Sequence, residues 1–147
     1  MTYAHTQRGP TWVILVSIGA VGLAGAWWFR ADPTLAVVLG SLGVAMVVFA
    51  FCFQSLTVAD DGHGLAIRFG PLPLFRTHIA YASITHVEAG QSAVIDGWGI
   101  HFVPGRGWTY NLWGRSCVCL TVRGRPMRIG SDDAEGLARF IRSKIAP

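Results

Sequence analysis

Charged side chains are scarce in this sequence. They make up 14% of its 147 residues, against about 25% in ordinary soluble proteins. Between Thr11 and Phe53 the only charged residues are Arg30 and Asp32, close together in the middle of the segment. Hydrophobic residues make up 52% of the chain. We therefore expect this early part of the chain to lie in lipid.

Two uninterrupted apolar runs, at residues 11–29 and 35–53, account for this composition. Each approaches the roughly 20 residues that a helix needs to cross the hydrocarbon core of a bilayer. A cleavable signal peptide fits less well, because its apolar core is about 7 to 15 residues long and precedes a small-residue cleavage site. Asp32 is a good helix cap and Pro33 suits a first helical turn. The sequence thus predicts an amino-terminal tail over residues 1–10 and a transmembrane helical hairpin over residues 11–54.

Neither predicted span carries an ionisable residue at mid-membrane depth. Proton relays and ion pathways usually need one, so the sequence argues against a transporter or a channel. Trp12 at one end of the first span, and Trp27 and Trp28 at the other, are expected to mark the two membrane interfaces.

Small residues recur four apart in both spans, a spacing that lets helix backbones approach closely. Either they form a dedicated helix contact, within the hairpin or with another protein, or they reflect the abundance of small residues in membrane helices. The residues concerned are Ala20 and Ala24, Gly22 and Ala26, and Ser41 and Ala45.

Residues that carry catalysis or bind metals are few and scattered. The chain has three cysteines, of which Cys117 and Cys119 lie two apart, without a CxxC or HExxH motif. The glycines around Arg106 lack the rest of either phosphate-binding signature, and no nucleophile elbow surrounds a serine. We expect no metal, no cofactor and no enzymatic activity. From residue 54 onward the chain has ten Lys and Arg residues and seven Asp and Glu residues. This excess of positive charge is too small for a nucleic-acid interface.

After residue 54 the hydrophobic pattern changes to a period of two, which is typical of β-strands. Leu65, Ile67 and Phe69 alternate in one such segment, and further short segments follow between clusters of Gly and Pro. Several strands of this kind predict a closed or nearly closed antiparallel sheet. The end of the chain differs, because Ser131 is a good N-cap and apolar residues recur at helical spacing over residues 137–145. A terminal amphipathic helix is expected there.

Strands followed by one terminal helix resemble the bacterial pleckstrin-homology-like (PH-like) domains of small proteins with two amino-terminal membrane helices. The resemblance rests on the segments LTVADDGHGLAIRFGP and GWGIHF and above all on CVCLTVRGRPMRIGSDDAEGLARFI. It implies a membrane-anchored α+β protein in which a bent antiparallel sheet or barrel, capped by the C-terminal helix, occupies residues 55–147.

The resemblance also implies a binding platform for lipids, peptides or partner subunits. Asp60 and Asp61 stand in the first turn between strands, where phosphoinositide-binding PH domains carry Lys and Arg, so specific inositol-phosphate recognition is not expected. The positive-inside rule mildly favours both chain ends in the cytoplasm. We therefore expect a multi-pass protein of the bacterial inner membrane with a cytoplasmic PH-like domain.

The expected function is a non-enzymatic interaction module that acts as an accessory or stabilising subunit or scaffold of a larger membrane protein complex. The alternative is a peripheral sensor of anionic lipid headgroups, and a third is an uncharacterised enzyme. The first two hypotheses would use one exposed tryptophan and a rim of arginines near the predicted turns. These residues are Trp113, Arg115, Arg106, Arg123, Arg125 and Arg128.

Residues 97–114 concentrate aromatic side chains and glycines, and PGRG in their middle predicts a hairpin turn. Trp113 falls on the opposite face from Trp108, where a partner or a membrane interface would meet it. The other face is expected to fill the interior of the sheet or to cover its open side. Its residues are Trp98, Ile100, Phe102, Trp108, Tyr110 and Leu112.

Overall fold

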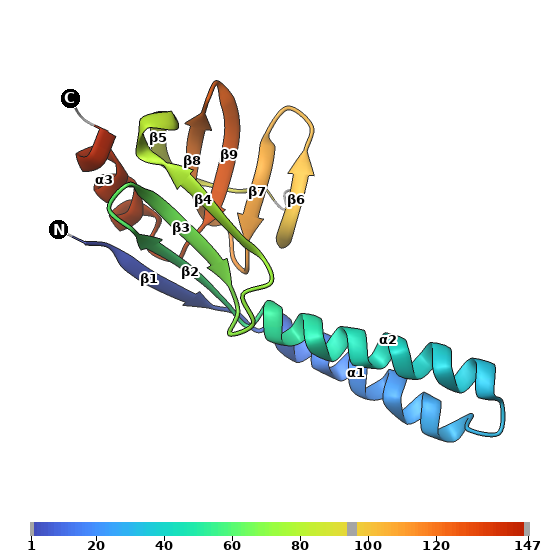
Figure 1. Cartoon of the computed structure of the whole chain (residues 1–147). Helices are drawn as coiled ribbons and strands as arrows, with labels where there is room; N and C mark the ends of the chain where they lie inside the picture. Colours follow the sequence, from blue (N-terminus) through green and yellow to red (C-terminus); the bar gives the residue numbers. More distant parts are fainter. Residues whose placement is uncertain (1, 94–96, 146–147) are drawn as a thin grey trace.

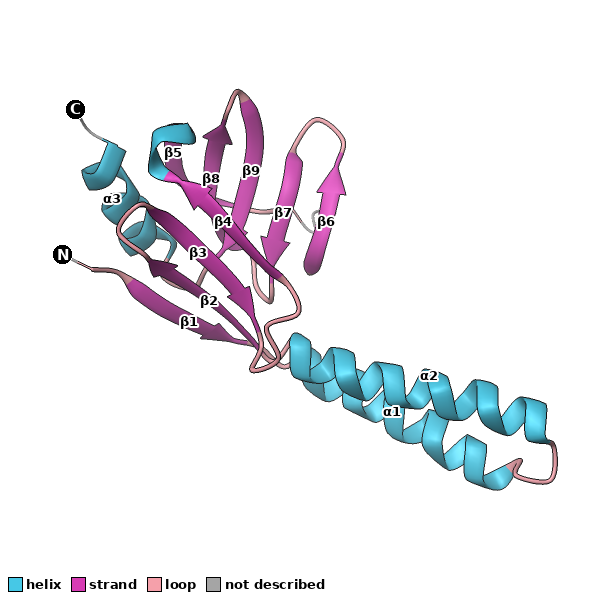
Figure 2. Cartoon of the chain, in the orientation of Figure 1, coloured by secondary structure: helices cyan, strands magenta, loops and turns pink. Residues whose placement is uncertain are grey.

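The computed structural model describes residues 2–93 and 97–145. A helical hairpin extends from a domain of two sheets, and a third helix lies on the far side of that domain (Figures 1 and 2). In chain order the elements are β1 (Ala4–Arg8), α1 (Thr11–Trp28), α2 (Pro33–Cys52), β2 (Ser55–Asp60), β3 (Gly64–Phe69), β4 (Arg76–Ala80), the short 3-10 helix η1 (Tyr81–Ser83), β5 (Ile84–Gln91), β6 (Gly99–Val103), β7 (Gly107–Asn111), β8 (Ser116–Val122), β9 (Arg125–Gly130) and α3 (Ala134–Ile145).

Glycine allows α1 and α2 to pack closely against each other. Gly22 faces Gly43 so closely that a Cβ atom added to Gly22 would lie 3.0 Å from the Gly43 Cα atom. As predicted, Asp32 caps α2, since its carboxylate accepts hydrogen bonds from the backbone N–H groups of Thr34 (3.0 Å) and Leu35 (3.1 Å). Both helices are long and apolar enough to cross a membrane. Their outward faces are apolar and exposed, with Val21 and Val37 among the most exposed residues.

Within the described residues the strands form a four-stranded sheet in the order β1-β2-β3-β4 and a five-stranded sheet in the order β5-β8-β9-β7-β6. The amino-terminal tail contributes β1, a strand that the sequence did not predict, which pairs antiparallel with β2. The expectation of a wholly antiparallel sheet or barrel is corrected in two respects. β7 runs parallel to β9, and the described strands do not join into a closed barrel. Period-two alternation shows which residues share a face of a strand, but not which strand lies beside it.

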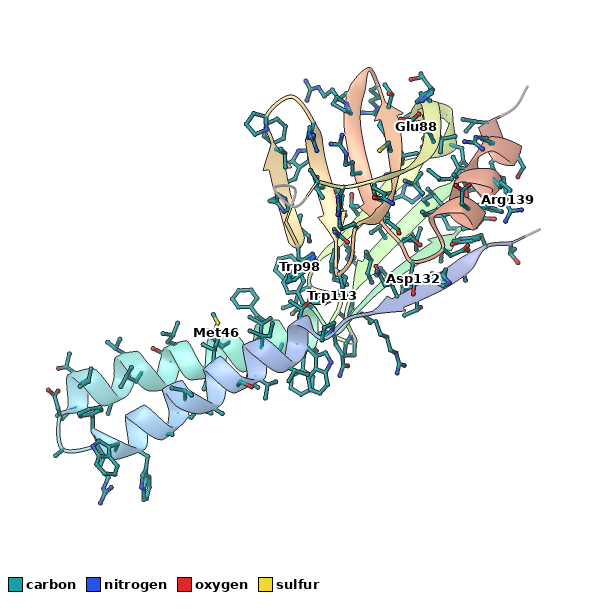
Figure 3. All side chains as sticks on the ribbon, turned by 180° about the vertical axis from the view of Figure 1, so that it is seen from behind. Met46, Glu88, Trp98, Trp113, Asp132 and Arg139 are labelled. Carbon is teal, nitrogen blue, oxygen red and sulfur yellow. The ribbon has the colours of Figure 1, made fainter. Side chains whose placement is uncertain are left out.

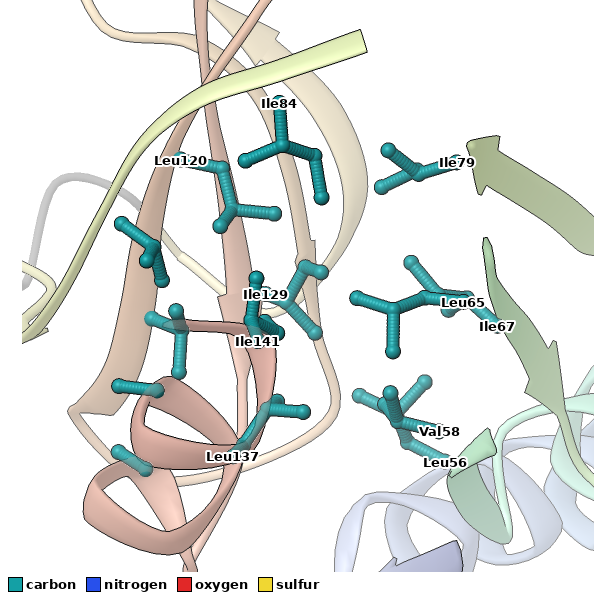
Figure 4. Close-up of a cluster of buried hydrophobic side chains, with 14 of the residues drawn as sticks. Leu56, Val58, Leu65, Ile67, Ile79, Ile84, Leu120, Ile129, Leu137 and Ile141 are labelled. Carbon is teal, nitrogen blue, oxygen red and sulfur yellow. The ribbon is translucent and has the colours of Figure 1, made fainter. Parts of the chain in front are cut away.

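The hydrophobic core lies between the two sheets and α3 (Figure 4). Leu65 and Ile67 of the first sheet meet Leu120 and Ile129 of the second, and all four are buried. Leu137 and Ile141 place the apolar face of α3 in the same core, which confirms the predicted terminal helix. Each such side chain contributes about 1.5–3 kcal/mol on burial. α3 thereby covers one side of the space between the sheets.

The start of α3 lies slightly later than the sequence indicates. The helix begins at Ala134, and the Asp133 carboxylate accepts a hydrogen bond from the Gly136 N–H at 3.2 Å. Ser131, the predicted N-cap, instead accepts from the Asp133 N–H at 3.1 Å and so stabilises the preceding turn. Two short polar side chains thus order the entry into the helix in succession.

Asp60 ties the end of α3 to the first sheet. Its side chain is 1% exposed and lies 3.1 Å from the Lys144 ammonium group. The Tyr81 hydroxyl donates to the same carboxylate at 2.8 Å, and this hydrogen bond, with the Gly62 N–H and Lys144, holds the pKa of Asp60 below its usual range. Asp60 therefore has a structural role that explains an acidic residue in this turn.

The β8–β9 hairpin closes with Arg123 at φ 50° and Gly124 at φ 74°. Positive φ at both central residues defines a type I′ turn, for which Asn-Gly is favoured. Arginine in this conformation costs roughly 1–2 kcal/mol. Arg123 is thus a local departure from the residue that the turn geometry prefers.

We expect Arg123→Asn to raise the free energy of unfolding by about 0.5–1 kcal/mol, because asparagine tolerates positive φ. Thermal and denaturant unfolding of the full chain in detergent micelles would measure this change. Arg125→Asn is the matched control, since it removes the same charge where φ is not positive. An equal gain in both variants would attribute the effect to charge and contradict the conformational explanation.

Candidate functional site

The sheet domain has two ends, which we name by their distance from the hairpin. The proximal end is where α1 and α2 leave the domain, and it contains the segments between β3 and β4 and between β7 and β8 (Figure 1). The distal end contains the β6–β7 and β8–β9 turns.

A groove lies between the two sheets on the side that α3 leaves uncovered. It has a volume of about 270 Å³ and is lined by β3 and the β3–β4 segment on one side and by β6 and β7 on the other. Its lining is mainly apolar and includes Ile67, Phe69, Leu74, Ile100, Trp108 and Tyr110. Arg76, which is exposed, adds a charge to this lining. An apolar groove of this kind accepts an apolar side chain from another molecule.

At the distal end the groove continues into a patch of aromatic and basic residues. Phe102 and Trp108 form an edge-to-face pair with ring centroids 5.9 Å apart, and they are 59% and 47% exposed. Together with Arg125 and Pro126 they line a second depression of about 370 Å³. We call Phe102, Trp108, Arg123 and Arg125 the distal patch. Exposed aromatic rings beside arginines are typical of the central residues of protein interfaces.

The predicted arginine rim is divided by the fold. Arg123 and Arg125 are exposed in and beside the β8–β9 turn, and Arg106 lies in the β6–β7 turn, all at the distal end. Arg128 lies in the middle of the second sheet, beside Cys119 and Thr109 on the neighbouring strands. Arg115 is exposed between β7 and β8, at the proximal end. Three of the five therefore lie at the distal end, and Arg128 reaches them from the sheet because its Nη1 atom donates to the Arg106 carbonyl at 3.0 Å. Arg115 is separated from the other four.

Residues 97–114 were expected to direct one set of side chains into the sheet interior or over its open side, and the structure places only some of them there. Ile100, Trp108 and Tyr110 line the groove, as expected for residues that cover an open side. In β7, however, the buried side chains include Thr109 and Asn111, each 1% exposed. The Asn111 side-chain amide donates to the Gly97 carbonyl at 3.4 Å, so Gly97, just before β6, lies over this outer face of the sheet. Sequence alternation does not reveal such a covering segment.

Trp98 departs from the predicted alternation because Gly99 has a φ of 100°. It packs against Trp113 instead, with the rings tilted by 33° and their centroids 4.1 Å apart, and remains 50% exposed. Trp113 is half-buried and packs against the core, whereas the sequence predicted an exposed side chain. Figure 3 shows the two tryptophans beside the start of the hairpin.

The small residues of the hairpin fall into two groups. Gly22 and Ala26 are half-buried between the helices, and Gly19 and Gly43, which the sequence did not single out, are fully buried there. Ala20, Ala24 and Ser41 are exposed, and Ala45 is half-buried. The helix contact thus depends on Gly19, Gly22 and Gly43, while the Ala20 and Ala24 face points outward. Trp12, Trp27 and Trp28 are exposed near the two ends of α1, as expected.

Residues with a capacity for chemistry remain scattered. No group of three or more His, Cys, Asp or Glu that would hold a metal ion is present in residues 2–93 and 97–145. Cys119 has an activated thiol. A hydrogen bond from Cys117, aided by the positive charge of Arg128, lowers its pKa to about 6. Two thiols on one strand form no evident catalytic centre.

The sequence matches no protein family model and no curated protein.

Cys119 is expected to react with iodoacetamide with a midpoint near pH 6, against about 8.5 for an ordinary thiol, because the thiolate is the reacting species. Mass spectrometry of the alkylated full chain across the pH range measures the midpoint. Arg128→Gln should move it upward, whereas Arg128→Lys should retain most of the lowering. A midpoint near that of free cysteine in the unchanged protein would show that Cys119 is not activated.

Proposed function

We propose that this chain is a non-enzymatic, membrane-anchored PH-like interaction module that serves as an accessory subunit of a larger membrane protein complex. The main observation in support of this proposal is the distal patch. Its aromatic rings and arginines are exposed on the side of the domain that faces away from the hairpin. A partner of matching chemistry presents an apolar side chain flanked by acidic groups.

The membrane anchor is supported by α1 and α2. They span 18 and 20 residues, close to the roughly 20 that cross a bilayer. Their apolar side chains point outward rather than into a protein core, and tryptophans lie near both ends of α1. In water this surface would be a large exposed apolar patch, which folded proteins avoid unless something covers it. We propose that bilayer lipid covers it and that the chain is a multi-pass inner-membrane protein with a cytoplasmic domain.

The PH-like assignment is supported by the order of the elements. Two sheets pack face to face, and a helix at the chain terminus covers one side of the space between them. The opposite side is the groove beside β4, β6 and β7. Binding platforms use such uncovered surfaces, and the groove leads directly to the distal patch because Trp108 lines both depressions.

The alternative function, a sensor of anionic lipid headgroups, needs its arginines at the bilayer. β9 is six residues long, so Arg125 lies about 17–20 Å beyond the proximal end of that strand. Charges are largely screened beyond a Debye length of about 8 Å at physiological ionic strength. The arginines of the distal patch therefore favour a protein partner over the lipid that holds the hairpin. For an enzymatic function, the third hypothesis, the described residues offer the Cys119 thiol but no metal-binding cluster beside it.

Purification of the tagged full chain in mild detergent, at native abundance, tests the proposal. We expect a defined set of membrane proteins to accompany the unchanged chain. The double variant Trp108→Ala and Arg125→Ala should weaken this association by about 2 kcal/mol, or roughly 30-fold, because both residues are of types common at interface hot spots.

Arg139→Ala is the matched control, since Arg139 is exposed on α3, away from the distal patch (Figure 3). It should leave the association unchanged, and circular dichroism should show that all variants fold. A wild-type chain that consistently purifies alone, or equal losses in the control, would refute the proposed role of the distal patch.

A further inference from the structure

A tryptophan pair lies at the point where the hairpin joins the sheet domain, and local contacts determine its position. The Thr11 hydroxyl, at the first residue of α1, donates to the Leu112 carbonyl at 3.1 Å. The Gln7 side-chain amide donates to the Trp113 carbonyl at 2.8 Å. Gly9 lies against the Trp113 side chain, where a Cβ atom at position 9 would be 2.6 Å from the Trp113 Cβ. The segment after β7 is thus held at the level where α1 begins.

This level coincides with an expected membrane interface. Trp12, the next residue along α1, is exposed and belongs to the aromatic residues that mark the ends of the apolar helices. Because Leu112 contacts Thr11, the Trp98 and Trp113 pair lies within a short distance of the same boundary. The outer ring of this pair, Trp98, is half-exposed. An indole that is apolar over most of its surface and carries one N–H group is well suited to the headgroup region of a bilayer.

The pair forms one wall of an open pocket of about 410 Å³. Its other lining residues are Ser92, Ala93, Gly97, Gly114 and Arg115, of which Arg115 is exposed. The Arg115 Nε atom donates to the Ser92 carbonyl at 3.5 Å, which orients the guanidinium group beside the tryptophans. An apolar aromatic wall with a cation at its rim matches a phospholipid, whose apolar chains adjoin a phosphate.

We infer that Trp98, Trp113 and Arg115 form a second membrane contact, in which the indoles lie at headgroup level and Arg115 pairs with a phospholipid phosphate. The inference rests on the proposed insertion of α1 and α2. This second contact would fix the orientation of the sheet domain relative to the bilayer surface. The occupant is lipid because Trp113, which lines the pocket, lies against Gly9, just before the apolar helix α1, and Leu112 accepts a hydrogen bond from Thr11 in the first turn of that helix. In this orientation the distal patch points away from the bilayer.

Fluorine NMR of the full chain, labelled with 5-fluorotryptophan in lipid nanodiscs, tests this contact. The six tryptophan resonances are assigned by single Trp→Phe variants. A lipid with a nitroxide on its headgroup broadens the resonances of nearby fluorine atoms. We expect Trp98 to broaden several-fold more than Trp108, to an extent comparable with Trp12. Trp108 is an internal control, because it belongs to the same domain but lies in the distal patch.

The role of Arg115 has its own measurement. Broadening of Trp98 should be greater in an equal mixture of phosphatidylcholine and phosphatidylglycerol than in phosphatidylcholine alone. Arg115→Gln should abolish this difference, whereas the control Arg139→Gln should retain it. A difference that survives Arg115→Gln would overturn the assignment of the phosphate contact.

The outcomes distinguish this inference from the proposed anchor. If Trp12, Trp27 and Trp28 do not broaden, the hairpin does not span the bilayer and the anchor proposal fails. If these three broaden while Trp98 and Trp113 resemble Trp108, the anchor stands and the second membrane contact is refuted. In that case the pocket would be open to a protein partner instead.

Discussion

The attachment of the helical hairpin to the sheet domain determines the direction of every other surface in this molecule. Connections of three kinds contribute to it. Gly70 adopts a φ of 61° where its N–H donates to the Ser55 carbonyl at 2.7 Å, and the backbone at the end of α2 lies too close for any side chain at this position. Phe53 contacts both Phe69 and Phe75, with ring centroids 5.3 and 5.4 Å apart. Thr11 binds the backbone after β7 on the opposite sheet.

Because the hairpin is held by both sheets, the two ends of the domain are not equivalent. The proximal end, with Trp98, Trp113 and Arg115, lies beside the apolar helices. The distal patch lies at the opposite end of the strands. The same residue types, tryptophan and arginine, therefore lie in different surroundings at each end. At the proximal end they adjoin the surface that lipid is proposed to cover, and at the distal end they face the solvent from which a partner would approach.

One side of the two-sheet domain is uncovered because the terminal helix α3 covers only the other. α3 inserts Leu137 and Ile141 between the sheets and is tied to β2 through Lys144 and Asp60. One helix of twelve residues covers one side only, so the groove lined by Trp108 and Tyr110 remains open. Aromatic side chains in such a position stabilise the sheet on one face and remain available on the other.

The sequence by itself determined the hairpin and the terminal helix, because both depend on local properties: apolar length, the Asp32 cap and the helical spacing from Leu137 to Ile145. Alternation also located most strands. It did not determine that β1 joins β2, that β7 runs parallel to β9, or that Thr109 and Asn111 are buried. These features depend on strand neighbours and covering segments that lie far away in the chain. Only the tertiary structure decided which end of β8 adjoins the hairpin, since the contacts of Leu112 with Thr11 and of Trp113 with Gly9 place Arg115 there and leave Arg123 and Arg125 at the other end.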